Sequence, residues 1–513
     1  MSAINWGRIR PASWIGSPLP IVRDGFAALG MRFRVPLKPG DAKNTEQLDL
    51  YADLVYAPSS QAHGGLPGTG TNDPSKAFAR AMQNAGETQH LTVYLCGGPG
   101  DGNPAFANLE LNRTLLTAGS PVLYLDYRGT GRSSPVKAAT LRARFGPTAT
   151  PTSARAAADY LVLFRQDYIA ADLESIRLAL SLSLNLVPRH GSPGLKLTLL
   201  GQSFGGWIAL TYLSFAPQHA VRGVYLTGGT PPIFRRPDEV YAALFRRVER
   251  ANEEYYARYP QDAKRVRAVA AWLDGHGPVR LPDGQQALTA RTFLTLGRHF
   301  GRGAEGMARV HDLVERLHED IATGGAPEHR TLRQFATSGG AGFRLHERPL
   351  YGVLHEAIYC SGPRATSGWA AQRIGRGLPR GGWAWLREDY VFGPPGRAAA
   401  SCEPLYFSGE MIYEFMLRDA GPELEPFVEP ARELARREGW SRMYDAERLA
   451  RNTVPVRSLV YPNDMYVEYG LSLETAARIG RCRVVPAPAS WLHASIKTRT
   501  RDVCRKLLKN EQG

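Results

Sequence analysis

The chain has 513 residues, 43% of them hydrophobic, and a formal net charge of +15 at pH 7. A chain of this size can bury a large core, and its length suits either one catalytic domain with a big insertion or two domains in series. Its Lys and Arg residues are scattered and not interleaved with aromatic residues in one tract, so we expect a generally basic surface and no nucleic-acid partner.

The cysteines and the apolar runs narrow the class of protein further. Five cysteines, an odd number without C-x-x-C spacing, indicate free thiols in a reducing compartment and neither a disulfide framework nor a zinc site. The first twenty residues lack a continuous apolar segment, and no apolar run reaches membrane-spanning length. We therefore expect a cytoplasmic protein with no membrane partner, no metal and no cofactor.

The N-terminal part of the chain predicts strands. Residues 31–37 and 47–56 alternate apolar and polar side chains, as antiparallel strands with one solvated face do. A stretch rich in Gly, Ser, Pro and Asn at 58–90 predicts a long loop. Short, largely apolar runs at 91–95 and 121–125 then predict two buried strands.

Each of these two buried strands leads into a glycine-rich loop. The loop at 96–100, CGGPG, brings backbone amides close to whatever lies beyond the strand end, although the same residues also suit a plain tight turn. The loop at 126–133 carries two arginines and an aspartate, which we expect to form an ion-paired scaffold beside a site. Helical spacing follows at 168–182, with Asp172 and Glu174 as surface or loop-anchoring charges.

Residues 196–210, KLTLLGQSFGGWIAL, predict a strand, a sharp turn and a helix. The turn is G-x-S-x-G around Ser203, and its glycines leave room for a serine on so tight a bend. Such an elbow holds Ser203 Oγ clear of the sheet, with the N-terminus of the helix behind it. We predict that Ser203 is a nucleophile. The predicted oxyanion donors are backbone N–H groups of Phe204, Gly97 and Gly98.

The pattern changes after another buried strand at 223–226. Up to that point strands alternate with helices, which predicts an α/β fold with a mostly parallel sheet, helices on both faces and a site outside the carboxyl ends of the strands. Beyond it we expect a mainly helical cap at 231–451, inserted into a catalytic domain made of residues 1–230 and 452–513. Helical spacing is strongest at 240–259, 289–300 and 307–317.

Two strands, 456–461 and 482–485, are predicted after the insertion. Asp464 follows the first of them, and His493 lies in the loop after the second. The order Ser203, Asp464, His493 is the order of catalytic triad members in α/β hydrolases. His493 would take the proton of the serine while Asp464 holds the other ring nitrogen. The rival aspartates, Asp445 and Asp502, do not follow a strand.

Several segments together resemble the proline iminopeptidases, also called prolyl aminopeptidases. The insertion also resembles the cap of their longer-chain bacterial type. One departure is Cys96, where the family commonly has histidine. The matching segments are CGGPG at 96–100, DYRGTGRS at 126–133, GQSFGG at 201–206, PLYGVLHEAIY at 349–359, YFSGEMIY at 406–413 and NDMYV at 463–467.

The resemblance implies an α/β-hydrolase fold with a large, mainly helical cap, and release of N-terminal proline from small peptides through an acyl-enzyme on Ser203. An exopeptidase must bind a free cationic amine, and buried carboxylates of a cap suit it. Glu356 and Glu410 are our candidates, because each stands among aromatic and aliphatic residues; the alternative is that they pair with arginines such as Arg373. The candidates for an apolar slot around the pyrrolidine ring are Phe204, Tyr359 and Trp369.

Other functions remain open at this point. An esterase or a broader aminopeptidase could use the same residues, since fold and triad do not set the substrate. A non-catalytic binding protein and a nucleic-acid-binding protein are more distant alternatives, and Ser203 disfavours epoxide hydrolase or dehalogenase chemistry, which needs a carboxylate nucleophile. The sequence leaves the accepted peptide length, tolerance for hydroxyproline or alanine, and a homo-oligomer undecided.

Overall fold

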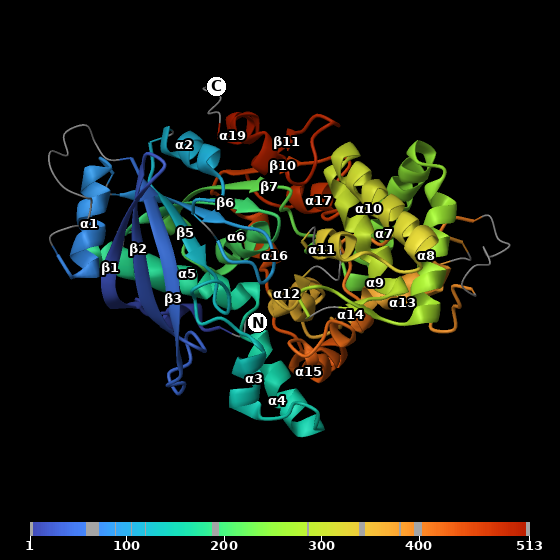
Figure 1. The fold of residues 1–513 in the computed structure, drawn as a ribbon. Helices are drawn as coiled ribbons and strands as arrows, with labels where there is room; N and C mark the ends of the chain where they lie inside the picture. The colour runs from blue at the N-terminus through green and yellow to red at the C-terminus, as the bar shows by residue number, and fades with distance from the viewer. Residues whose placement is uncertain are drawn as a thin grey trace.

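The computed structural model describes residues 4–57, 71–87, 89–103, 105–117, 119–186, 194–284, 287–337, 344–378, 381–393 and 403–508. Within them a large twisted sheet with helices packed against it occupies one part of the molecule, and a group of helices lies beside it (Figure 1). This is the α/β class that the alternation of strands and helices predicts.

The main sheet runs in the order β1-β2-β3-β5-β4-β6-β7-β10-β11. The three pairs from β1 to β5 are antiparallel, and the pairs from β5 to β11 are parallel. Sites of α/β proteins lie beyond the carboxyl ends of such parallel strands. The strands are β1 Ser13–Arg23, β2 Phe26–Pro36, β3 Gln47–Tyr56, β4 His90–Leu95, β5 Val122–Asp126, β6 Lys196–Gln202, β7 Val221–Thr227, β8 Val279–Arg280, β9 Ala287–Leu288, β10 Val456–Val460 and β11 Cys482–Pro486.

Two groups of helices differ in their place in the fold. Helices α1 to α6 and α17 to α19 belong to the part of the chain that forms the sheet, and α7 to α16 lie between β7 and β10. Short 3-10 helices occur in both groups. The α-helices are α1 Pro74–Asn84, α2 Leu109–Thr117, α3 Ala138–Phe145, α4 Pro151–Val162, α5 Gln166–Ser183, α6 Phe204–Phe215, α7 Pro237–Arg258, α8 Asp262–His276, α9 Ala290–Phe293, α10 Ala304–Gly324, α11 His329–Thr337, α12 Pro349–Leu354, α13 Ala370–Gly377, α14 Glu414–Arg418, α15 Glu425–Arg436, α16 Ala446–Ala450, α17 Tyr469–Ala476, α18 Ser495–Thr498 and α19 Thr500–Leu508.

The strands predicted from alternation and apolar runs are present, but three local predictions are wrong. The first is the loop expected at 58–90: residues 74–84 form α1, which Asp73 caps, and residues 58–70 lie outside the described residues. The second is the single helix expected at 289–300, which is α9 followed by the 3-10 helix η3 (Leu294–Arg302). The third is the surface placement of Asp172 and Glu174, which are both buried.

Buried ion pairs explain that third difference. Asp172 accepts two hydrogen bonds of 2.6 Å from the guanidinium of Arg128, which lies in the loop after β5. Glu174 pairs with Arg177 at 2.7 Å and accepts from the hydroxyl of Tyr212. A buried carboxylate is tolerated when it is paired and hydrogen-bonded in this way. Asp172 therefore does anchor the loop at 126–133, from inside the protein.

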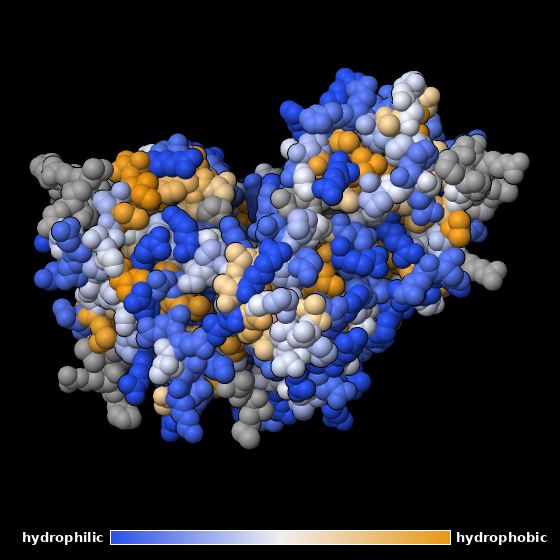
Figure 2. All heavy atoms as spheres, turned by 60° about the horizontal axis from the view of Figure 1, so that its bottom comes forward, coloured by the Kyte–Doolittle hydropathy of each residue, from blue (hydrophilic) through white to orange (hydrophobic). Residues whose placement is uncertain are grey.

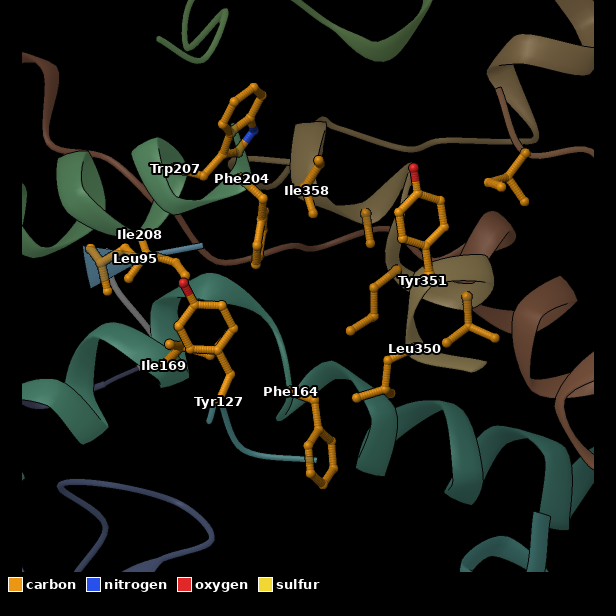
Figure 3. Packing of buried hydrophobic residues seen from close by; sticks show 14 of the residues in the cluster. Leu95, Tyr127, Phe164, Ile169, Phe204, Trp207, Ile208, Leu350, Tyr351 and Ile358 are labelled. Atoms are coloured by element: carbon orange, nitrogen blue, oxygen red, sulfur yellow. The ribbon is translucent and has the colours of Figure 1, made fainter. Parts of the chain in front are cut away.

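The helices between β7 and β10 share one hydrophobic core with the sheet. Leu350 and Tyr351 of α12 lie in the same buried cluster as Phe164 and Phe204 (Figure 3). A Cβ on Gly100, in the loop after β4, would lie 2.7 Å from the backbone nitrogen of Tyr351. So close an approach fixes α12 directly over the carboxyl end of the parallel strands.

The outer surface is largely hydrophilic, with small separate apolar areas on the face that Figure 2 shows. Within the described ranges no helix combines the length and the apolar composition that a bilayer crossing requires.

Candidate active site

Ser203 stands on a strained turn between β6 and α6. Its φ is 52° and its ψ is −127°, a backbone conformation that residues other than glycine rarely adopt. Its backbone N–H donates to the carbonyl of Thr227 at 3.2 Å. A Cβ on Gly205 would lie 2.0 Å from the carbonyl oxygen of Leu95, so the glycine of the motif is required for β4 and α6 to pack. The turn has the form of a nucleophile elbow.

Asp464 and His493 form a hydrogen-bonded pair. Asp464 Oδ2 accepts from His493 Nδ1 at 2.8 Å, and its Oδ1 accepts from the backbone N–H groups of Tyr466 and Val467 at 2.8 and 3.0 Å. These bonds fix the carboxylate, which is 1% exposed. With Nδ1 protonated, the Nε2 of the neutral ring is free to accept a proton.

The surroundings of His493 favour its charged form. Burial works against the imidazolium, but the charge of Asp464 and its hydrogen bond outweigh burial, so the pKa of His493 is raised above its usual value. The ring of Tyr466 packs edge-on against the imidazole at 4.8 Å between centroids. A Cβ on Gly228, just after β7, would lie 3.0 Å from His493 Nδ1. The imidazole is therefore held from several sides.

Ser203 and His493 line the same cavity, which has a volume of about 960 Å³. Its wall combines the loop after β4 with residues of α12, η3 and α18. The described part of the chain contains no hydrogen bond from Ser203 Oγ to the ring; such pairs tighten when substrate binds. The cavity thus brings together a serine on an elbow and an oriented histidine.

The predicted oxyanion donors lie around the elbow. The Phe204 N–H is at the first position of α6, where helical amides have no partner within the helix. Gly97 donates its N–H to the side chain of Gln202 at 3.1 Å. Gly98 also lines the cavity, and a Cβ on it would lie 3.8 Å from the Phe204 ring. Of the two loop glycines, the N–H of Gly98 is the one that no hydrogen bond occupies within the described residues.

Glu410 is the acidic candidate that the structure places on the cavity. Its carboxylate accepts a hydrogen bond of 2.6 Å from the hydroxyl of Tyr351, another residue of the cavity wall. Burial and the charge of Glu410 raise the pKa of Tyr351 well above its usual value, so Tyr351 remains a donor at any physiological pH. Tyr351 holds one carboxylate oxygen in place.

Glu356 lies elsewhere, at the N-terminus of α13. Its two oxygens accept from the backbone N–H groups of Ala370 and Ala371 at 3.0 and 2.9 Å. Burial raises its pKa to about 7, against these hydrogen bonds, which lower it. Glu356 does not line the cavity, and Arg373, the partner considered from the sequence, pairs with Asp238 instead.

Tyr359 and Trp369 are not on the cavity wall either. The ring of Tyr359 packs edge-on between Trp207 and Tyr241, at 6.1 and 5.9 Å between centroids, and lines a separate small hollow beside α6. Trp369 takes a left-handed conformation, with φ 55°, just before α13. The two rings are part of the packing of the helical insertion.

Sequence reasoning missed several residues of the cavity. Tyr351 is within the segment that resembles a known cap, yet nothing in the sequence shows that it meets Glu410. Lys497 could have been found from its position, because it stands four residues after His493, a spacing of about one helical turn. Arg348 and Asp101, which pair at 2.8 Å, lie far apart in the chain. In the described ranges no group of three or more His, Cys, Asp or Glu side chains is placed to hold a metal ion.

The fold and the cavity define the class of protein. Residues 92–309 match a family model described as alpha/beta hydrolase fold. A likeness to a solved esterase from Exiguobacterium antarcticum covers 82% of this chain and 91% of that one, at 13% identity and a TM-score of 0.30. The serine elbow, the mostly parallel sheet and the family model make this chain an α/β hydrolase.

Two relatives identify the family within that class. The chain is 37% identical to a proline iminopeptidase from Aeromonas sobria over 473 residues, which are 91% of this chain and 93% of the relative. It is 32% identical over 411 residues to a protein named proline iminopeptidase aneH from Aspergillus aculeatus, with 80% and 82% of the two chains covered. The chain belongs to the proline iminopeptidase family.

Proposed function

We propose that this hydrolase releases N-terminal proline from small peptides through an acyl-enzyme on Ser203. The observation that carries the proposal is the cavity in which an elbow serine, a histidine held by Asp464 and the carboxylate of Glu410 face one volume. The names of the two relatives agree with this activity. Ser203 and His493 would carry out acyl transfer, and the carboxylate of Glu410 would make the enzyme require a substrate with a free amine.

In the first half of the reaction Ser203 Oγ attacks the carbonyl carbon of the proline residue. His493 Nε2 takes the hydroxyl proton, and the imidazolium is stabilised by Asp464. The negative charge on the carbonyl oxygen is bound by the N–H groups of Phe204 and Gly98, and each such donor contributes a factor of about 100 to 1,000 in rate.

In the second half of the reaction the peptide bond breaks and the histidine changes role. His493 gives its proton to the leaving amine, so the shortened peptide departs and proline stays esterified to Ser203. A water molecule that gives its proton to His493 then attacks the ester, and free proline is released. The raised pKa of His493 suits a group that must hold the proton between these two transfers.

The substrate amine is assigned to Glu410. A prolyl amine is cationic at neutral pH, and a carboxylate that Tyr351 already orients can accept a charge-assisted hydrogen bond from it. We further propose that residues 231–451 act as a cap, because α12 brings Tyr351 over the strand ends and Glu410 lies in the same insertion. The cap would then select substrates while the sheet performs the chemistry.

We also propose a cytoplasmic location. Cys96, Cys360, Cys482 and Cys504 are free thiols in the described residues, and free thiols persist where the medium is reducing. Burial raises the pKa of each to about 12. They would thus be poor nucleophiles at neutral pH.

The test is hydrolysis of proline and alanine anilides by the purified protein, beside their N-acylated forms. We expect fast cleavage of the free-amine proline anilide and a loss of about 10⁵-fold or more in the Ser203→Ala variant. Ser214→Ala is the matched control, because this serine on α6 only donates to the carbonyl of Leu210. Equal cleavage of blocked and free substrates, or cleavage of esters alone, would leave a serine hydrolase and remove the exopeptidase activity.

A further inference from the structure

The charged side chains of the active-site cavity are unbalanced. Its wall carries more cationic than acidic side chains, although binding the cationic substrate amine requires only an acidic one. The cations are Arg298, Arg302, Arg344, Arg348 and Lys497, and the acids are Asp101, Glu347 and Glu410.

The three acids are already engaged. Asp101 pairs with Arg348, Glu347 pairs with Arg344, and Glu410 accepts from a tyrosine hydroxyl. Arg302 and Lys497, by contrast, make no ion pair with any described residue, and both side chains are exposed to solvent. These two cations are therefore available to an anionic group that enters the cavity.

Lys497 is placed on the same part of the cavity wall as His493. It is on α18, four residues after His493, and both residues line the same cavity as Cys96, which precedes the oxyanion loop. Arg302 follows Gly301, on which a Cβ would lie 2.3 Å from the side chain of Tyr466, the ring that packs against His493. The cations thus lie around the histidine that must protonate the leaving amine.

Covalent geometry limits where the end of a short peptide can be. In a prolyl dipeptide the leaving nitrogen and the carboxylate carbon are joined through one Cα, so they are about 2.5 Å apart. Each further residue adds at most about 3.6 Å. When the leaving nitrogen is within reach of His493, the carboxylate of a dipeptide or tripeptide stays within a few ångström of it, inside the cavity whose wall carries Lys497 and Arg302.

We propose that Lys497 and Arg302 form a subsite for the C-terminal carboxylate of prolyl dipeptides and tripeptides. The inference rests on the proposed function, since it assumes that peptides with N-terminal proline are the substrates. Glu410 then binds the positive end of a short peptide and the two cations bind its negative end. The enzyme prefers peptides that carry both charges close to the scissile bond.

The experiment compares Pro-Gly with Pro-Gly-amide, and Pro-Gly-Gly with its amide, in the wild type and in Lys497→Gln and Arg302→Gln. Each kcat/KM is divided by that for proline anilide in the same variant, which corrects for any general loss of activity. The intrinsic reactivity of each leaving group is the same in every variant. A change in the ratio of acid to amide on substitution therefore measures the carboxylate subsite.

We expect the ratio of acid to amide to fall about three- to tenfold in Lys497→Gln for the dipeptide, since an exposed charge-assisted bond is weak. About 1 M NaCl should reduce the wild-type ratio in the same direction by screening. Lys506→Gln, the same substitution on α19 outside this cavity, should leave the ratio unchanged.

The outcomes separate the two proposals. Cleavage of proline anilide with a ratio that neither substitution changes would overturn the carboxylate subsite and leave the aminopeptidase intact. If the protein cleaved neither proline anilide nor any of the peptides, the proposed function itself would be overturned. A loss confined to Arg302→Gln would move the subsite away from Lys497 and contradict the assignment of the dipeptide carboxylate.

Discussion

The sheet and the helical insertion position their polar side chains in different ways. Ser203, Asp464 and His493 each follow a strand of one continuous sheet, so the register of β6, β10 and β11 sets their places. Glu356 and Glu410 lie among short helices and irregular segments, where only packing decides which way a side chain points. The positions of side chains that follow regular strands can be predicted from the sequence, and those of side chains in irregular helical segments cannot.

The two acids of the insertion show what this means. Both stand in segments rich in aromatic residues, and both suit a buried carboxylate. One is satisfied by two backbone amides of α13, and the other accepts from a tyrosine on the cavity wall. The two carboxylates therefore differ in their hydrogen-bond donors, and experiments can test whether they also differ in role.

The largest expected effect concerns the sheet. Asp464→Asn removes the charge that stabilises the imidazolium and places the wrong tautomer beside Ser203, so kcat for proline anilide should fall about 10⁴-fold. Asp445→Asn is the matched control, because Asp445 caps α16 through the N–H of Arg448 and Asn caps as well. A loss of tenfold or less in Asp464→Asn would show that Asp464 does not orient and stabilise the catalytic base.

The pH profile gives the same variant a second readout. His493 must be neutral to take the serine proton, and its pKa is raised, so kcat/KM of the wild type should rise with pH along a limb centred above the usual histidine value. In Asp464→Asn the raising effects of the Asp464 carboxylate are gone, while burial still lowers the pKa and only the charge of Glu410 still raises it. The residual activity should therefore show its acid limb at lower pH.

The residues at the carboxyl ends of the parallel strands could be predicted from the sequence for a physical reason. An apolar run that ends in G-x-S-x-G fixes a strand, a turn and a helix together, because only that backbone places a serine there. Asp464 and His493 follow runs whose parallel pairing puts their ends side by side. Strand β1 could not be predicted from the sequence, because Pro18 and Pro20 interrupt its alternation of apolar and polar residues. Its pairing with β2 also shifts register between Ile15 and Leu19.

The walls of the cavity were not predictable in the same way. Tyr351 and Glu410 are 59 residues apart and meet because α12 packs closely against α14, where a Cβ on Gly352 would lie 2.7 Å from Leu417. Asp101 meets Arg348 across an even longer separation of 247 residues. Local periodicity carries no information about such contacts, because they depend on how several short helices fit together.

The next expected effect tests the binding carboxylate. Glu410→Gln removes the negative charge but keeps the shape, so kcat/KM for proline anilide should fall about 10- to 100-fold through loss of a charge-assisted hydrogen bond to the amine. Glu347→Gln, on the same cavity but paired with Arg344 at the surface, should change kcat/KM by less than about threefold. Comparable losses in both variants would point to the overall charge of the cavity instead of an amine site.

The smallest effect on activity is expected at Glu356, where the change should appear in stability. Gln can accept with one oxygen only, and its NH₂ group would face the second amide of α13, so Glu356→Gln should lower the free energy of unfolding by about 1–3 kcal/mol in urea titrations. Glu388→Gln, whose side chain is 78% exposed in its ion pair, should have almost no effect.

The pH dependence of that stability sharpens the assignment. The folded-state pKa of Glu356 is raised to about 7, so between its unfolded value and pH 7 the folded state binds more protons than the unfolded state. This contribution therefore stabilises the fold as pH falls toward the unfolded value and is lost as pH rises to 7, and Glu356→Gln should lack it. If Glu356→Gln instead raised KM for free-amine substrates and left stability unchanged, Glu356 would belong with Glu410 at the amine, and the contrast between the two acids would disappear.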